Sequence, residues 1–252
     1  MRPAKKSYPN VCAFSEKVAS LPLVHQPGEK WTYSIGMDIL GCVIERASGV
    51  TFGTFLEENI FGPLGMTDTF FEVPESKQDR MIDLYGHKKS FKEFGVELPK
   101  NLGDKKLILL DPKEDSFFFQ EASIEDGGSG LVSTARDYLK FAKMLLNEGS
   151  LKGTTILRPE TVKIMTSNQV EKKAKPNRFD AFGQGVTVGI ALNAKKMRMQ
   201  RGNNSFFWGG AARTMFWVDP KNDLIFVNMS QVLGSPRINN KVEKLVYKTL
   251  GL

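Results

Sequence analysis

Tyr33 is the first residue whose type and position could do chemistry. It comes directly before Ser34, whose hydroxyl can accept a hydrogen bond from the free amides at the start of a helix. A phenol at the mouth of a helix can face a cleft while its ring packs below, and that geometry suits proton transfer. The alternative is a packed aromatic residue with a satisfied hydroxyl, which is the commoner role of a tyrosine considered alone.

A second candidate is the run Trp208, Gly209 and Gly210, which stands ahead of a strand-like segment. Two adjacent glycines let a ligand come within hydrogen-bonding distance of the main chain. Residues 214–218 and 224–229 are strand-like and are joined by a segment typical of a hairpin turn. The sequence therefore predicts an open stretch of backbone at the start of a β-hairpin.

Two helices are predicted after Tyr33, and a rigid turn ends the second one. The first is expected to begin at Ser34 and to end at Gly49, and its apolar residues cover most of its circumference, which predicts a central position. Thr51 is expected to cap the second helix, which stops at residues 62–65, Gly-Pro-Leu-Gly.

A glycine cluster, Gly127, Gly128 and Gly130, precedes another predicted helix. It lacks the Lys and Ser/Thr of a P-loop and the GxGxxG spacing, so it predicts a turn that approaches other backbone closely. Thr134 and Asp137 then predict a helix cap of the Ser/Thr-x-x-acid type. The remaining expected elements are a helix at Pro159–Met165, a strand at residues 185–192 and a final helix at Asn239–Leu250.

The composition is that of an ordinary globular protein. Of 252 residues, 41% are hydrophobic and 25% charged, and no apolar run is long enough to span a bilayer. Basic residues near Met1 are not followed by an apolar stretch, so a cytoplasmic location is expected. Cys12 and Cys42 are too few to imply a disulfide framework and are predicted to be reduced thiols with structural roles.

The net charge of +7 is concentrated in basic runs at residues 87–92, 171–178 and 195–201. No zinc-finger, helix-turn-helix or RNA-binding signature accompanies them, so we expect solvated loops and no nucleic-acid or membrane partner. Two histidines and two distant cysteines form no recognisable metal-ligand set, and no cofactor is expected. His25 has no Ser or Asp at triad-like spacing and is interpreted as a surface or packing residue.

The sequence around Tyr33 resembles a known family. The pattern PGEKWTYSIGMDILGCVIERASG, followed by a helix and IFGPLGMTDT, is similar to β-lactamase-like serine hydrolases, in particular the family VIII carboxylesterases related to class C β-lactamases. The resemblance makes Tyr33 the second element of the active site. The β-lactamases place Asn two residues after this tyrosine, whereas this chain has Ile35, which favours ester chemistry over lactam chemistry.

The resemblance also assigns roles to the glycine-containing run. Trp208, Gly209 and Gly210 stand where penicillin-recognising enzymes carry Lys-Thr-Gly, and esterase relatives carry Trp-Gly-Gly. The backbone amide of Ala211 would then be one donor of the oxyanion hole, and Trp208 would shape the acyl pocket. The implied substrate is a small-molecule ester that reacts through an acyl-enzyme.

The family's nucleophile is the Ser of Ser-x-x-Lys, and no Ser in this sequence has Lys three residues later. Three explanations stay open: a truncated hydrolase, one piece of an enzyme completed by an N-terminal segment or by self-association, or a non-catalytic binding module. The implied fold is α+β, with an antiparallel sheet flanked by helices and a helical lobe, but without the N-terminal strands and nucleophile helix.

Residues 1–252 would form a partial domain of this kind, with residues 31–165 as the mainly helical lobe and cleft loops and residues 180–252 as the sheet and C-terminal helix. Without the N-terminal elements, the sheet should expose an edge and the first helix an apolar face.

Overall fold

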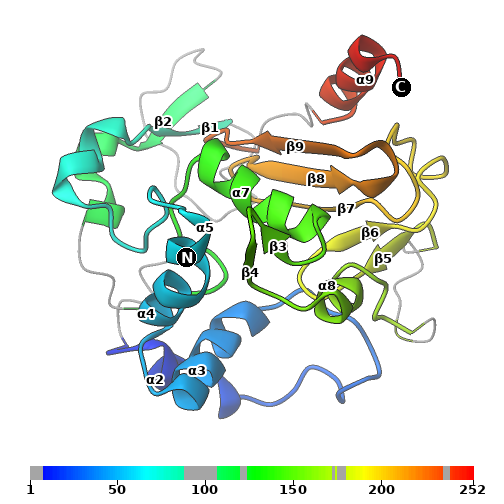
Figure 1. The fold of residues 1–252 in the computed structure, drawn as a ribbon. Coiled ribbons are helices and arrows are strands. Elements are labelled where there is room, and N and C mark those ends of the chain that lie inside the picture. The colour runs from blue at the N-terminus through cyan, green and yellow to red at the C-terminus, as the bar shows by residue number, and fades with distance from the viewer. Residues whose placement is uncertain (1–7, 88–106, 120–123, 172–173, 175–179, 235–238) are drawn as a thin grey trace. The chain divides into compact units, whose positions relative to one another are not determined.

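The structure of the chain is a computed structural model that describes residues 8–87, 107–119, 124–171, 174, 180–234 and 239–252. Most of two basic runs, residues 87–92 and 171–178, lies outside the described residues. The chain divides into two compact units, whose elements are drawn in Figure 1. Unit 1 comprises Met1–Gln78, Phe117–Arg158 and Val170–Pro176, and unit 2 comprises Asp79–Ser116, Pro159–Gln169 and Asn177–Leu252.

Unit 1 is mainly helical. Its elements are α2 (Val11–Ala19), α3 (Gly36–Ser48), α4 (Phe52–Leu56), η1 (Glu57–Phe61), α5 (Gly62–Leu64), η4 (Phe117–Phe119), α7 (Ala135–Leu146), β3 (Ser150–Leu151) and β4 (Thr154–Thr155), and η2 (Glu75–Arg80) crosses into unit 2. The predicted helix signals are confirmed at Gly49 and Gly65, which cap α3 and α5 with φ of 78° and 65°. Thr51 caps α4 by accepting a 3.2 Å hydrogen bond from the Thr54 amide.

The prediction that the first helix is central is wrong. The apolar side chains of Met37, Leu40 and Val43 on α3 are 39%, 45% and 53% exposed. The buried side of α3 instead carries a carboxylate, a glycine and a cysteine, namely Asp38, Gly41 and Cys42. The apolar residues around this helix did not reveal which of its sides is covered by the rest of the protein. The exposed apolar face that the sequence predicted for this helix is present.

Cys12 and Cys42 form a disulfide that joins α2 to α3, so the prediction of two reduced thiols is wrong. Val11, Cys42 and Ile124 form a small buried cluster at this junction. Two cysteines separated by 30 residues give no sequence pattern for pairing. The contact depends on α2 packing against α3, which the sequence alone did not predict.

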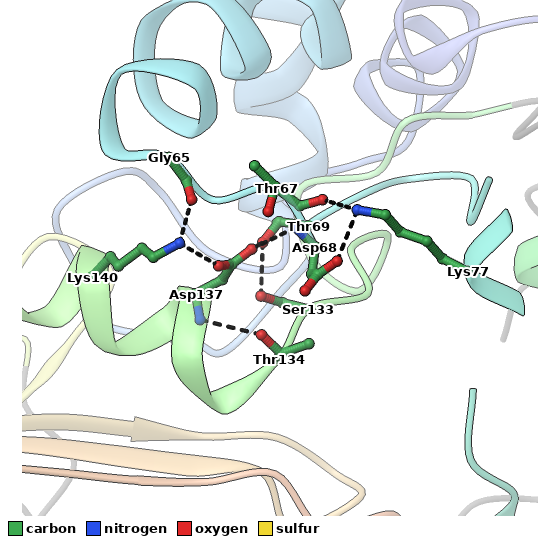
Figure 2. A network of polar contacts seen from close by, with 9 residues as sticks. All are labelled: Gly65, Thr67, Asp68, Thr69, Lys77, Ser133, Thr134, Asp137 and Lys140. Carbon is green, nitrogen blue, oxygen red and sulfur yellow. Dashed lines mark hydrogen bonds and ion pairs between the residues drawn. The ribbon is translucent and has the colours of Figure 1, made fainter. Parts of the chain in front are cut away.

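Asp137 is the centre of a polar network that ties α7 to the turn after α5. Figure 2 shows its carboxylate among donors from both segments. Asp137 Oδ2 accepts hydrogen bonds from the Asp68 amide at 2.6 Å and from Thr69 Oγ1 at 3.2 Å, while Lys140 Nζ lies 2.8 Å from Oδ1. Lys140 also donates to the Gly65 carbonyl oxygen. The side chain of Asp137 is only 2% exposed, so this is a nearly buried ion pair with several supporting donors.

The predicted cap at the start of α7 is confirmed in part. Thr134 Oγ1 accepts a 3.2 Å hydrogen bond from the Asp137 amide, as an N-cap should. The Asp137 carboxylate, however, reaches Asp68 and Thr69 rather than completing a capping box. Asp is one methylene shorter than Glu, and here it serves a tertiary contact.

Unit 2 contains two sheets and two α-helices among its described residues. Its elements are β1 (Leu84–His87), β2 (Leu107–Asp111), η3 (Lys113–Asp115), α8 (Pro159–Met165), β5 (Phe182–Gln184), β6 (Gly189–Ala191), β7 (Phe206–Gly209), β8 (Met215–Asp219), η7 (Pro220–Asn222), β9 (Leu224–Asn228), β10 (Val232–Leu233) and α9 (Asn239–Leu250). The predicted bounds of α8 and α9 are confirmed.

The larger sheet is antiparallel and has the order β5-β6-β7-β8-β9. The yellow to orange strands of Figure 1 follow this order. Its centre is buried, with Trp217 and Val218 fully enclosed and the Trp217 ring stacked on Phe226 at 4.0 Å between centroids. No described strand pairs with the outer side of β9, so the expected free sheet edge is present. The smaller sheet has the order β10-β1-β2.

The strand predicted at residues 185–192 is confirmed only in its second half, because residues 185–188 form a turn. β5 ends at Gln184 and β6 begins at Gly189, and the Gly185 amide donates a 2.8 Å hydrogen bond to the Val188 carbonyl oxygen. Thr187 has a φ of 73°, a left-handed conformation that β-branched residues rarely adopt. A run of β-branched residues therefore predicted a longer strand than the backbone forms.

The helical part of unit 1 includes one bent pair of helices, at residues 36–48 and 52–64, with an angle of 81° between them. Only this pair taken together has the length and apolar composition of a membrane span, and within the described residues no single helix does.

Candidate functional site

The loop that carries Tyr33 belongs to unit 1 and leads into α3. The Trp31 amide donates a 3.0 Å hydrogen bond to the Ala174 carbonyl oxygen, and His25 Nε2 lies 2.8 Å from Thr32 Oγ1. Both contacts hold the loop immediately before Tyr33, whose own side chain is 72% exposed. The interpretation of Tyr33 as a buried packing residue is therefore wrong, and the phenol is presented outward. His25 has the structural role that the sequence predicted.

The helix behind Tyr33 starts two residues later than predicted. Ile35 occupies the N-cap position of α3 without a side-chain cap, so the expectation that Ser34 caps this helix is wrong. The first turn is held instead by Asp38, which is 2% exposed and accepts a 3.0 Å hydrogen bond from the Gly128 amide. A carboxylate in the first turn also complements the positive end of the helix dipole.

The glycine cluster fits closely against this first turn, as the sequence predicted. A Cβ on Gly127 would clash with the Met37 carbonyl oxygen, and one on Gly128 would lie 3.1 Å from Asp38 Oδ1. The side chain of Asp126 stabilises the turn by accepting a 2.5 Å hydrogen bond from the Ser129 amide. Glycine at these positions lets the loop approach α3, and that contact supports the helix that Tyr33 precedes.

Trp208, Gly209 and Gly210 belong to unit 2. They lie at the end of β7, which the sequence did not predict as a strand, rather than ahead of a single hairpin. Gly209 pairs with Met215 of β8, and the Gly210 amide donates a 2.8 Å hydrogen bond to the Thr214 carbonyl oxygen. A Cβ on Gly210 would clash with Thr214 Oγ1, so a side chain at this position would require Thr214 to move.

The turn between β7 and β8 is held by the last residue of β9 and by residues that follow this strand. Asn228 Nδ2 and Ser230 Oγ donate hydrogen bonds to the Arg213 carbonyl oxygen at 3.0 and 2.8 Å. Val232, at the start of β10, donates from its amide to the Ala212 carbonyl oxygen at 3.1 Å. Arg213 has a φ of 66°, a left-handed conformation that these neighbours maintain.

Ala211 lies at the exposed tip of this held turn. Within the described part of the chain, the amides of Ala211 and Ala212 make no hydrogen bond, whereas the amides of Gly210 and Arg213 on either side of this pair do. An unused N–H on a fixed turn is the kind of donor that can stabilise developing negative charge on an acyl oxygen. The Ala211 amide is therefore available to donate a hydrogen bond to a bound group.

The residues that pin this turn were missed from the sequence. Asn228 lies near the end of the strand predicted at residues 224–229 and Ser230 follows it, so both resemble ordinary polar residues of a strand end. Their only signal is the spacing Asn-x-Ser, in which two short polar side chains share one face of an extended chain. Their partner, the Arg213 carbonyl oxygen, is defined only once β8 and β9 pair.

Among the described residues, no group of three or more His, Cys, Asp or Glu side chains could hold a metal ion. In unit 1, the candidate residues supply the phenol of Tyr33. In unit 2, they supply the unused amide of Ala211, two glycines and the indole of Trp208.

Comparison with known proteins agrees with these features. The sequence model of the Beta-lactamase family matches residues 3–249. This chain belongs to the β-lactamase family. Its α+β fold is that of β-lactamase-like and penicillin-binding-protein-like esterases, which confirms the fold and the family resemblance found in the sequence.

Relatives in the β-lactamase family include esterases and acyltransferases. The chain is 30% identical to Protein Rv1367c of Mycobacterium tuberculosis, over 93% of this chain and 61% of that protein. It is 28% identical to the lovastatin esterase of Penicillium rubens, over 86% of this chain and 54% of the esterase. The solved structure of "EstCE1, a hydrolase with promiscuous acyltransferase activity" matches with a TM-score of 0.76 at 22% identity, over 94% of this chain and 61% of that one. The chain thus spans a little over half the length of these relatives.

Proposed function

We propose that this chain is part of a serine carboxylesterase that acts on small acyl esters through an acyl-enzyme. The observation that carries the proposal is the unused Ala211 amide on a turn fixed by Asn228 and Ser230. A preorganised donor of this kind costs no reorganisation when the tetrahedral intermediate forms. The family, with its esterase and acyltransferase members, supplies the reaction class, and Ile35 in place of the family's Asn supports ester over lactam substrates.

The proposed roles follow the chemistry of each group. Tyr33 exchanges a proton with the nucleophile and then with the leaving group, for which an exposed phenol is suited. The Ala211 amide stabilises the oxyanion, and Trp208 shapes the site for the acyl group. Gly209 and Gly210 let the substrate approach the main chain beside Ala211.

The nucleophile of the proposed reaction is not among these residues. The sequence contains no Ser-x-x-Lys, and the chain spans only 61% of the Mycobacterium tuberculosis relative. We infer that a segment outside this sequence, in the same protein or in a complementing polypeptide, brings the Ser and the Lys. The Lys is essential to this scheme because a tyrosine becomes a base near neutral pH only when a neighbouring cation lowers its pKa.

The test is ester hydrolysis by the protein from the complete reading frame. A p-nitrophenyl ester of a short acid serves as substrate, nitrocefin as the lactam comparison, and a fluorophosphonate as the serine-directed probe. Ala211→Pro removes the N–H and is expected to lower kcat by about 10²–10³-fold, whereas Ala211→Ser keeps the N–H and most of the activity. Circular dichroism checks that both variants are folded. Equal activity of the Pro and Ser variants, or no labelling of the complete protein, contradicts the proposal.

A second candidate is a non-catalytic binding module derived from the same fold. The absence of Ser-x-x-Lys from the sequence favours it. It predicts that the complete protein neither hydrolyses esters nor reacts with the fluorophosphonate, yet binds a non-hydrolysable ester analogue. Loss of that binding in Trp208→Ala would assign the ligand to the same residues.

The cytoplasmic location remains a prediction. Disulfides such as Cys12–Cys42 persist mainly in oxidising compartments, so the redox state of this pair tests the predicted location. Alkylation of free thiols in freshly lysed cells, followed by mass spectrometry, distinguishes a reduced pair from an oxidised one.

A further inference from the structure

A basic cavity of about 720 Å³ lies within unit 2, and none of its lining residues belongs to the turn that carries Ala211. Its walls come from residues 194–203, which connect β6 to β7, from the end of η7 and from one position of α9. The volume is within the range of about 300–1,000 Å³ that is usual for small-molecule sites. Most residues of the basic run at residues 195–201, which the proposed function leaves unexplained, line this cavity.

Four exposed cations line this cavity without a partner. The side chains of Lys195, Arg198, Lys221 and Lys244 make no ion pair or hydrogen bond in the described part of the chain, and no lining residue is an Asp or Glu. Lys196 provides the contrast, because its Nζ lies 3.6 Å from Asp180 Oδ2 and it is not a lining residue. The unpaired charges therefore gather in the concavity rather than along the whole basic run.

Two buried carboxylates fix the walls of the cavity by accepting hydrogen bonds from the loop that lines it. Glu243 of α9, 2% exposed, accepts hydrogen bonds from the amides of Gln200 at 2.7 Å and Arg201 at 3.2 Å. Asp219 at the end of β8, fully buried, accepts a 3.0 Å hydrogen bond from the Gly202 amide. These carboxylates fix the loop to α9 and to the sheet, but neither is exposed to a ligand in the cavity.

Arg201 contributes a buried ion pair to the wall. Its side chain is 4% exposed, its Nη2 lies 3.1 Å from Glu243 Oε2, and its Cζ lies 4.6 Å from the centre of the Phe207 ring. Its Nε and Nη1 atoms are buried and have no hydrogen-bond partner within the described residues. Glu243 offsets the charge of this guanidinium, so the net positive charge of the cavity comes from the four exposed cations.

The cavity and the Ala211 turn lie at opposite ends of the same strands. Residues 194–203 lead into the first residue of β7, and Lys221 follows the last residue of β8. The turn at residues 210–214 joins the other ends of β7 and β8. A ligand in the cavity therefore does not occupy the proposed oxyanion site.

We propose that this cavity binds a small soluble molecule that carries two or more phosphate groups. Each phosphate group brings a charge of about −1.5 to −2 near pH 7, so two of them match the four unpaired cations. The cavity is too wide for a single phosphate to contact all of its walls. Cations that converge on a concavity from three segments suit a compact ligand, whereas a nucleic acid or membrane surface requires a stripe or a flat patch.

The binding test uses the full chain, pyrophosphate as the probe and isothermal titration calorimetry at low salt. The double variant Arg198→Gln/Lys244→Gln removes two lining charges and is expected to weaken pyrophosphate binding about tenfold or more. The single variant Lys196→Gln is the matched control, since it removes an adjacent charge of the same loop outside the lining, and it should change the dissociation constant less than twofold. All three substitutions are at exposed residues, and circular dichroism confirms that each variant is folded.

Four results would overturn the proposal. One is the absence of pyrophosphate binding at millimolar concentration. Another is an equal loss of affinity in Lys196→Gln, which would show attraction to net charge alone. The third is binding to an RNA oligonucleotide or to vesicles with anionic lipid without binding to pyrophosphate. Inorganic phosphate is the comparison for the number of groups, and affinity equal to that of pyrophosphate would contradict a requirement for two.

Discussion

Tyr247 of α9 donates a 2.7 Å hydrogen bond to Asp219 Oδ2, and this bond links the C-terminal helix to the end of β8. Both side chains are buried, with exposures of 1% and 0%. Together with the contact between Glu243 and Arg201, it explains how α9, with many charged residues on its outer side, is held to the sheet. The helix is positioned by buried polar groups as well as by apolar packing.

We expect Tyr247→Phe to lower the free energy of unfolding by about 1.5–3 kcal/mol, because it removes a donor from a buried carboxylate. Urea denaturation followed by circular dichroism measures the change. Lys248→Gln, an exposed position on the same helix turn, is the control and should have an effect within about 0.5 kcal/mol. A Phe variant as stable as the parent protein would show that Asp219 does not depend on Tyr247.

The same carboxylate predicts a dependence of stability on pH. Burial by itself raises the pKa of Asp219, but hydrogen bonds from Tyr247, Asn222 and the Gly202 amide outweigh it and hold the pKa below its usual value. The folded protein therefore binds this proton less readily than the unfolded chain. Its contribution to stability is present above the unfolded pKa of about 3.9 and is lost as the pH falls below that value. The parent protein should lose this contribution to stability as the pH falls, whereas Asp219→Asn has no such contribution to lose. Denaturation curves recorded between pH 7 and pH 3 measure the difference between the two proteins.

Asp137 is expected to be the most sensitive polar residue of unit 1. Asp137→Asn keeps the size of the side chain but removes the charge that Lys140 and the Asp68 amide require, and we expect a loss of about 1–3 kcal/mol in unfolding free energy. The control Lys143→Gln changes an exposed residue of the same helix. Denaturation at two salt concentrations separates the effect of the buried Asp137–Lys140 pair from the effect of the exposed Lys143 charge, because a buried pair is screened far less than an exposed charge. An Asn variant that is as stable as the control would contradict the role assigned to the network in Figure 2.

Gly127→Ala should displace the loop that supports the first turn of α3, since the added methyl group clashes with the Met37 carbonyl oxygen. We expect a stability loss of about 1–3 kcal/mol and faster proteolysis near Tyr33. Gly36→Ala is the matched control because nothing lies within 4 Å of a Cβ at Gly36, which is in a helix. That variant should be neutral or slightly stabilising, by up to about 1 kcal/mol. A tolerated alanine at Gly127 would show that the close contact is not required.

The Cys12–Cys42 disulfide closes a loop across 30 residues, so its removal by Cys12→Ser/Cys42→Ser is expected to cost about 2–4 kcal/mol. The parent protein should lose a similar amount in dithiothreitol, whereas the double variant should not respond to the reductant. If both proteins respond equally, or neither does, the cysteines do not stabilise α2 against α3.

Local signals in the sequence were sufficient for several elements. Gly49 and Gly65 end helices because glycine adopts left-handed backbone conformations without a steric penalty, and Thr51 and Thr134 cap helices through their own hydroxyl groups. The bounds of α8 and α9 were predicted correctly for the same reason, because each depends on residues within a few positions. The glycine cluster was also recognised as a close-packing turn, although its partner was not.

Failures occurred where distant residues decide the structure. Ser34 is a suitable cap by type, but the first turn of α3 is held by Asp38 and Gly128, which are 90 positions apart. The pattern of residues 185–192 suits a strand, yet its first half, residues 185–188, forms the turn of a hairpin that pairs β5 with β6. In each case a tertiary contact outweighed the local preference.

The sequence by itself determined the family, the α+β class and the two candidate regions around Tyr33 and Trp208, because motifs and caps are properties of adjacent residues. Only the tertiary structure decided that Cys12 bonds to Cys42, that Ala211 keeps an unused amide and that separate cations converge on one cavity. These features require segments far apart in the chain to meet, and the free energy that brings them together comes from burial and packing of the whole unit rather than from any short stretch.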